Sequence, residues 1–183
     1  MPILRNESGI VYTSLQEINP LIAPSEVGVF KIHSEAEVLL KNPLDSKTSV
    51  EIYKYIPSDL DHSFRQRGLN PSVAISYWSG SDEKVHDRVK RSLAPHTNSV
   101  GNNEVHLIVS GALIIYIDNG QGQYATLLQP GDWIYIDGKS EAWPKLTFES
   151  SFTLVSYHSS PLAPVDEFHK DLKFTATEMK NIL

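Results

Sequence analysis

A chain of 183 residues, with 40% hydrophobic and 21% charged residues, has the composition of a globular protein and the length to bury a core. Its formal net charge of −6 argues against a nucleic-acid partner, because phosphate binding needs a surplus of Lys and Arg on one face. The absence of cysteine excludes disulfides, thiolate nucleophiles and cysteine-ligated metals, so His nitrogens and carboxylate oxygens would have to hold any metal. The sequence contains no stretch typical of a signal peptide or membrane span, and we expect no membrane partner and a cytoplasmic location.

The N-terminal residues 1–70 are predicted to contain helices and a strand that pack on a barrel. Ser25 is a candidate helix cap, and the residues after it could form helical segments at Val27–Ile32 and Ser34–Leu40. Ser49–Ile56 alternates apolar with polar residues, which is typical of a strand. Ser58–Gly68 begins with capping residues and ends on a glycine, as short helices do.

The pattern of the sequence changes in residues 71–160, where short runs rich in Val, Ile, Tyr, Thr and Phe, which favour strands, alternate with turn residues. Short strands punctuated in this way predict an antiparallel sandwich or barrel, and closure into a barrel removes exposed edges. The predicted strands are Val73–Trp78, Val105–Asp118, Tyr124–Leu128, Asp132–Ile136 and Phe152–His158. Residues 161–183 are predicted to form amphipathic helices on the outside, so that the whole chain makes one mainly β domain flanked by short helices at both ends.

The segment that carries chemistry runs from Pro95 to Gly111. Glu104 and His106 are two residues apart on a predicted strand and therefore share a face. If Glu104 points into the barrel, His106 and Ile108 do so as well. A carboxylate on an otherwise apolar strand needs a partner, because an unpaired charge is costly to bury.

This segment resembles the first motif of the cupin superfamily. In that motif, two His separated by one residue come before a Glu, and a Gly follows the Glu by seven positions. The spacing of Glu104 and Gly111 fits this motif, and Gly131–Trp143 looks like a degenerate copy of the second motif. Within the superfamily, the closest likeness is to the acireductone dioxygenases, over about Ser72–Pro161. The resemblance implies a cupin barrel, a double-stranded β-helix, as the fold.

The resemblance also implies a metal site, but only part of the ligand set is present. The family binds Fe(II) or Ni(II) through three His and one Glu. His96 matches the first His and Glu104 the Glu, whereas Asn98 and Ala142 replace the other two. The Arg that follows the Glu in the family is His106 here.

A different ligand set can be assembled from the same region. His96, Glu104 and His106 would form a set of two His and one carboxylate, which suits Fe, and Ni or Zn also accept these ligands. The other candidate ligands are Asn98, which is more typical of a turn, and Glu141 and His158, which we interpret as more peripheral. His106 could equally be the hydrogen-bond partner that keeps Glu104 satisfied.

Two classes of function follow from these residues. The first is a divergent acireductone-dioxygenase-like enzyme acting on a small polar metabolite in the barrel. It would use either a non-standard metal site or, without a cofactor, acid–base chemistry by Glu104 and His106 as catalytic residues. The second is a metal-free barrel that binds a small molecule or a protein, which the loss of a ligand at Ala142 favours. A homodimer is the assembly that the resemblance suggests.

Overall fold

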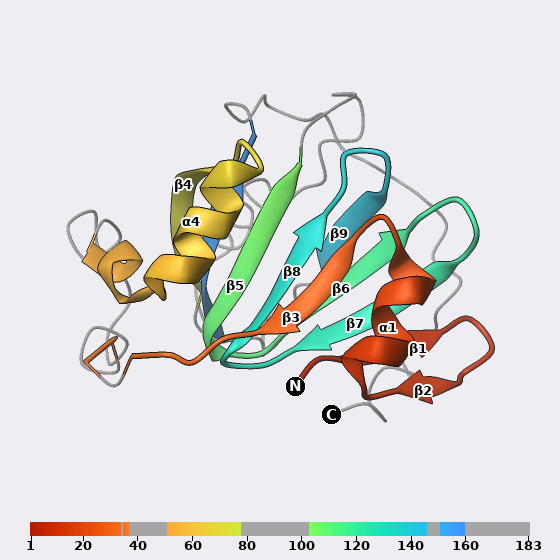
Figure 1. Ribbon diagram of the computed structural model, residues 1–183. Coiled ribbons are helices and arrows are strands. Elements are labelled where there is room, and N and C mark those ends of the chain that lie inside the picture. Colours follow the sequence, from red (N-terminus) through yellow and green to blue (C-terminus); the bar gives the residue numbers. More distant parts are fainter. Residues whose placement is uncertain (34, 37–50, 78–102, 146–150, 160–183) are drawn as a thin grey trace.

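The fold consists of two antiparallel sheets that face each other (Figure 1). The computed structural model describes residues 1–33, 35–36, 51–77, 103–145 and 151–159, to which every structural statement below refers. The first sheet has the order β2-β1-β7-β6-β9 and the second the order β3-β8-β5-β10-β4. The strands are β1 (Ile3–Asn6), β2 (Val11–Tyr12), β3 (Glu26–Val29), β4 (Asn70–Tyr77), β5 (Glu104–Gly111), β6 (Leu113–Asp118), β7 (Gln123–Leu128), β8 (Asp132–Ile136), β9 (Glu141–Lys145) and β10 (Phe152–His158).

The main hydrophobic core lies between the inner faces of the two sheets. Because side chains alternate between the faces of a strand, β5 contributes Ile108 to this core while Val105, Leu107 and Val109 pack on the opposite face. Helix α1 (Leu15–Ile22) buries Ile18 and Ile22 in the same core. The other buried members are Leu4, Val27, Leu113, Ile115, Ile117, Leu128, Ile134, Ile136, Ala142, Phe152 and Leu154.

A second core covers the outer face of the second sheet. Helix α4 (Ser58–Gln66) and the short 3₁₀ helix η1 (Ile52–Tyr55) lie on the side of β4 and β5 in Figure 1. Phe64 of α4 packs against the rings of Trp133 and Tyr157, with centroids 5.5 and 5.2 Å apart. The second sheet therefore packs against apolar side chains on both faces. A polar side chain on its inner face is surrounded by buried hydrophobic residues.

The mainly β architecture agrees with the sequence prediction, and so does the helix predicted at Ser58–Gly68. The predicted strand Val105–Asp118 is instead two strands, β5 and β6. Gly111 ends β5 with a φ of 71°, a conformation that favours glycine. Strand β9, which is not among the predicted strands, contains Pro144 and lies at the edge of its sheet, where proline is tolerated.

Two predictions in the N-terminal part were wrong. Val27–Ile32 was predicted to be helical, but Glu26–Val29 forms β3, which pairs with β8. Ser25 caps no helix there, because its Oγ accepts a hydrogen bond from the backbone NH of Asp137. The predicted strand Ser49–Ile56 instead contains η1, and both Ile52 in η1 and Ile56 directly after it are buried.

The N-terminal strands belong to the sheets themselves, because β1 pairs with β7 over four residues. Most of the predicted helix Ser34–Leu40 and the predicted helical tail 161–183 lie outside the described residues. In the described part of the chain, no helix is long and apolar enough to cross a membrane.

Candidate metal centre

Three side chains that can bind a metal come together on the inner face of the second sheet. Glu104 and His106 lie two apart on β5 and therefore point the same way. The antiparallel register places His158 of β10 opposite Glu104 and Ser156 opposite His106. The pairing of β5 and β10 thus assembles two imidazoles, a carboxylate and a hydroxyl from only two strands.

Both ring nitrogens of His106 face polar atoms. Its Nε2 lies 3.2 Å from Oε2 of Glu104, and its Nδ1 lies 2.7 Å from Oγ of Ser156. The ring of His158 stands nearly perpendicular to that of His106, with centroids 6.1 Å apart and an interplanar angle of 82°. The imidazole of His106 therefore contacts both Glu104 and Ser156 and lies near the ring of His158.

The ligand atoms are close enough for one ion. One atom each from Glu104, His106 and His158 lies within 4.8 Å of the other two. Three ligand atoms that each lie about 2.0–2.2 Å from one metal can be at most about 3.8 Å from one another when their three separations are equal. Side-chain adjustments of up to about 1 Å would therefore bring all three atoms into a coordination sphere, and this donor set fits a divalent ion.

The group lies in an apolar environment. The side chains of Glu104 and His106 are only 12% and 6% exposed. Ile136 and Ile134 of β8 pair with these two residues on one side, and Leu154 continues the inner face of β10. A low dielectric strengthens the attraction between a carboxylate and a cation, and it makes the carboxylate costly to keep without one.

Asn103, the residue before β5, holds the end of the site together. Its backbone NH donates to Oγ of Ser159, and the Ser159 NH donates to the Asn103 carbonyl. Its side-chain oxygen accepts from the NH of Gly138 in the turn between β8 and β9. Since Asn103 adjoins Glu104 and Ser159 adjoins His158, these bonds fix the strand ends from which two of the candidate ligands project.

A set of tyrosines supports β10 from the opposite face of the sheet. The Tyr53 hydroxyl donates to the backbone carbonyl of Ser156 at 2.9 Å, and the Tyr157 hydroxyl donates to Oδ1 of Asp61 at 2.8 Å. Burial raises the pKa of both Tyr53 and Tyr157, and the nearby Asp61 carboxylate raises that of Tyr157 further. Burial also acts to raise the pKa of Asp61, but hydrogen bonds from Arg65 and Tyr157 outweigh it and leave the pKa lowered.

The predicted site residues fall into three groups. Glu104, His106 and His158 are brought together. Glu141 is half-buried at the start of β9 and does not belong to the metal-capable group found among the described residues. His96 and Asn98 lie outside the described residues.

Sequence reasoning missed Ser156. The available signal was its position two residues before His158 in a predicted strand, which places both on one face. Its partner could not be predicted, because the pairing of β10 with β5 depends on the fold. Ala142, at the position where the acireductone dioxygenase motif has its last His, is buried in the main core.

Comparison with known proteins gives a match at the level of structure alone. No protein-family model and no curated protein sequence matches the chain. A solved structure described as acireductone dioxygenase from Bacillus anthracis with a cadmium ion in its active centre matches with a TM-score of 0.72 and 17% identity. The alignment covers 91% of this chain and 98% of that one. The two antiparallel sheets and this match together show that the chain has a cupin fold similar to that of acireductone dioxygenase.

Proposed function

We propose that this chain is a divergent, metal-dependent cupin enzyme that acts on a small polar metabolite at Glu104, His106 and His158. The observation that carries the proposal is the approach of three ligand atoms to within 4.8 Å of one another on the inner face of the barrel. The match to a solved structure that holds a cadmium ion in its active centre supports a metal site in a protein of this fold.

The composition of the ligand set suits Fe(II), Ni(II) or Zn(II). Two imidazoles and one carboxylate leave coordination positions open, as in non-haem iron oxygenases, and zinc accepts the same ligands. A bound ion would supply a Lewis acid, or a centre for oxygen chemistry if it is iron. Glu104 contributes the negative charge, and His106 and His158 contribute neutral donors that leave the site with a net positive charge for an anionic or enediol substrate.

The proposed site differs from that of the family in the strand that supplies one ligand. The resemblance expects a His at position 142, where this chain has a buried alanine. His158 on β10 provides an imidazole from a different strand, beside Glu104. His96 remains a predicted fourth ligand on the strength of the motif alone.

A metal-free enzyme is the second candidate, favoured by the 3.2 Å contact between His106 Nε2 and Glu104 Oε2. A buried carboxylate beside an imidazole can transfer protons in isomerisation, elimination or hydrolysis. A barrel that only binds a small molecule or a protein is the remaining alternative, in which the same pair would be structural.

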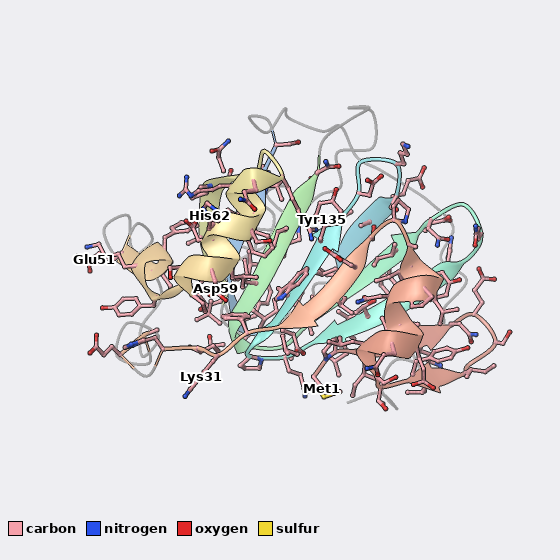
Figure 2. All side chains as sticks on the ribbon, viewed as in Figure 1. Met1, Lys31, Glu51, Asp59, His62 and Tyr135 are labelled. Carbon is pink, nitrogen blue, oxygen red and sulfur yellow. The ribbon has the colours of Figure 1, made fainter. Side chains whose placement is uncertain are left out.

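Metal analysis separates these functions. The purified protein is stripped with chelator, reloaded with Fe(II), Ni(II) or Zn(II), and compared with Glu104→Gln, His158→Gln and His96→Ala. His62→Gln is the matched control, because His62 is exposed on α4 (Figure 2). Its ring nitrogen Nε2 lies 2.9 Å from Nε2 of Gln66 on the same helix, away from the candidate ligands. We expect one ion per chain in the wild type and in the control, and a loss of affinity of about 100-fold or more in Glu104→Gln and His158→Gln, because each removes a ligand.

Thermal unfolding provides a second measurement. An ion at 100 times its Kd stabilises the folded state by about 2.7 kcal/mol, which corresponds to roughly 5–10 °C in Tm for a domain of this size. A wild type that gains neither an ion nor stability would refute the metal site. Metal-free turnover that Glu104→Gln abolishes would then support acid–base chemistry, and unchanged ligand binding in that variant would support the binding module.

A further inference from the structure

We propose that Ser156 is the positioning residue of the metal site: its hydroxyl serves both tautomers of His106, and metal binding moves the ring proton from Nε2 to Nδ1. This inference rests on the proposed metal site and adds a residue that lies outside the set of ligands. It also states a change in the protein that can be observed without any substrate.

The geometry places one polar partner at each ring nitrogen. Ser156 Oγ lies 2.7 Å from Nδ1, and Glu104 Oε2 lies 3.2 Å from Nε2. Ser156 and His106 are direct partners in the β5–β10 pairing, so the backbone register fixes the contact. A neutral imidazole has one NH and one lone pair, and its two partners therefore determine which nitrogen holds the proton.

Without a metal, Glu104 determines the tautomer. An ionised carboxylate can only accept hydrogen bonds, so the proton lies on Nε2 and points at Oε2. Nδ1 then presents its lone pair, and the Ser156 hydroxyl must donate to it. The opposite tautomer would direct the Nε2 lone pair at a carboxylate oxygen in a buried site, which is repulsive.

With a metal bound, the requirement is reversed. An ion held jointly by Glu104 and His106 needs the lone pair of Nε2, so the ring proton must be on Nδ1. Nδ1–H then donates to Ser156 Oγ, which now accepts. Ligand histidines commonly donate their second ring NH to such a partner.

A hydroxyl is the side chain that can serve both states, because it donates and accepts at one oxygen. Ser156 is fully buried, so water cannot readily take over this role. The hydrogen bond from the Tyr53 hydroxyl to the Ser156 carbonyl holds the backbone from the opposite face. Ser156 also adjoins an irregularity in the pairing of β10 with β4, between Ser156 and Tyr157.

The test is NMR of protein labelled with ¹⁵N-histidine, metal-free and loaded with Zn(II), in which long-range ¹H–¹⁵N correlations identify the protonated nitrogen of each ring. The His106 signals are assigned by their loss in His106→Gln. We expect Nε2–H in the metal-free wild type and Nδ1–H after zinc is added. The same protein samples give the zinc affinity by competition with a chelator.

Three variants isolate the hydroxyl. Ser156→Ala should weaken zinc binding by about 10–100-fold, and Ser156→Thr, which restores a hydroxyl, should recover most of the affinity. Thr126→Val is the control, because Thr126 Oγ1 is also buried but forms no hydrogen bond to any described residue. It should bind zinc as the wild type does.

The outcomes separate this inference from the proposed function. A wild type that binds no zinc would overturn both. Zinc binding with the proton on the same nitrogen of His106 before and after loading, or equal affinities for Ser156→Ala and the wild type, would overturn the role of Ser156 alone. If Ser156→Ala does not fold, the NMR comparison of the His106 tautomer in the wild type, with and without zinc, still tests the inference.

Discussion

At the scale of single residues, the structure explains why a glycine, Gly111, stands at the end of the strand that carries Glu104 and His106. It follows Glu104 by seven positions and ends β5 with a φ of 71°. A Cβ at this position would lie 1.8 Å from the backbone carbonyl oxygen of Ser151. The glycine therefore allows the chain to turn into β6 directly beside the start of β10, which keeps β5 and β10 in register at their other end, where Glu104 and His158 meet.

We predict that Gly111→Ala destabilises the protein strongly. The substitution combines a strained backbone conformation, which costs about 1–2 kcal/mol, with a clash against a backbone atom that cannot rotate away. Gly68→Ala is the control, because Gly68 has a similar φ of 77° and nothing within 4 Å of the added Cβ. In urea unfolding, Gly111→Ala should lose at least about 2 kcal/mol more than Gly68→Ala. Equal losses would show that the close approach to Ser151 is unimportant.

The candidate site was predictable from the sequence to the extent that it depends on one strand. Alternation along β5 correctly predicts that Glu104, His106 and Ile108 share the inner face. His158 was interpreted as peripheral and Ser156 was not considered, because both reach the site only through the pairing of β10 with β5. His106 and Ser156 are 50 residues apart in the sequence and come into contact only because their strands pair. A local sequence pattern does not predict which strands pair.

At the scale of elements, β10 connects the site to the helical layer on the other side of the sheet. Successive residues of this strand point to opposite faces, so His158 joins the metal-capable group while Tyr157 packs beneath α4. The hydrogen bond from Tyr157 to Asp61 fixes α4 to the strand, and Arg65 pairs with the same carboxylate at 2.8 Å. Placement of α4 and placement of His158 thus depend on the same segment.

We predict that Tyr157→Phe loosens this connection. The variant keeps the ring that packs on Phe64 but removes a hydrogen bond to a charged acceptor, which contributes about 1.5–3 kcal/mol. The free energy of unfolding measured in urea should fall by that amount, with a lower midpoint and an unchanged m-value. Tyr55→Phe, which removes a phenol hydroxyl from neighbouring η1, serves as the control. If both variants lose the same small amount, the bond to Asp61 contributes little to stability.

The elements that were predicted wrongly show where periodicity is ambiguous. Ile52 in η1 and Ile56 directly after it are both buried and lie four residues apart, a spacing that fits both a strand face and one helical turn. In β3, a cap-like serine suggested a helix, whereas Gly28 was the informative residue. A Cβ at Gly28 would lie 2.4 Å from the Trp133 ring, so the glycine marks a close approach between strands. That approach is a tertiary contact and is visible only in the fold.

At the scale of the whole molecule, the second sheet packs against a different core on each of its two faces. Its inner face carries the polar site, and its outer face buries aromatic rings whose hydroxyls must find partners. Tyr53 and Tyr157 satisfy this requirement through the Ser156 carbonyl and Asp61. Neutral tyrosines are therefore part of what keeps the sheet, its helical cover and the metal-capable group together.

This arrangement predicts that the protein loses stability in alkali through these two residues. Burial raises the pKa of Tyr53 and Tyr157 in the folded state, whereas unfolded tyrosine ionises near pH 10. A raised pKa means that the unfolded state releases the proton first, so the stabilisation is complete below about pH 10 and is lost as pH rises above it. Each of the two tyrosines can remove up to about 1.4 kcal/mol from the free energy of unfolding per pH unit in that range. Burial raises the pKa of Tyr116 as well, which adds to the slope.

Urea unfolding between pH 8 and 11, with tyrosinate absorbance recorded in parallel, measures this dependence. The double variant Tyr53→Phe/Tyr157→Phe is less stable than the wild type at pH 8, because two hydrogen bonds are lost. Its stability should nevertheless decline less steeply above pH 10, since phenylalanine has no proton to release. The two curves should therefore converge as pH rises. Parallel curves would mean that other groups cause the alkaline loss, and that the pKa of neither phenol is raised in the folded protein.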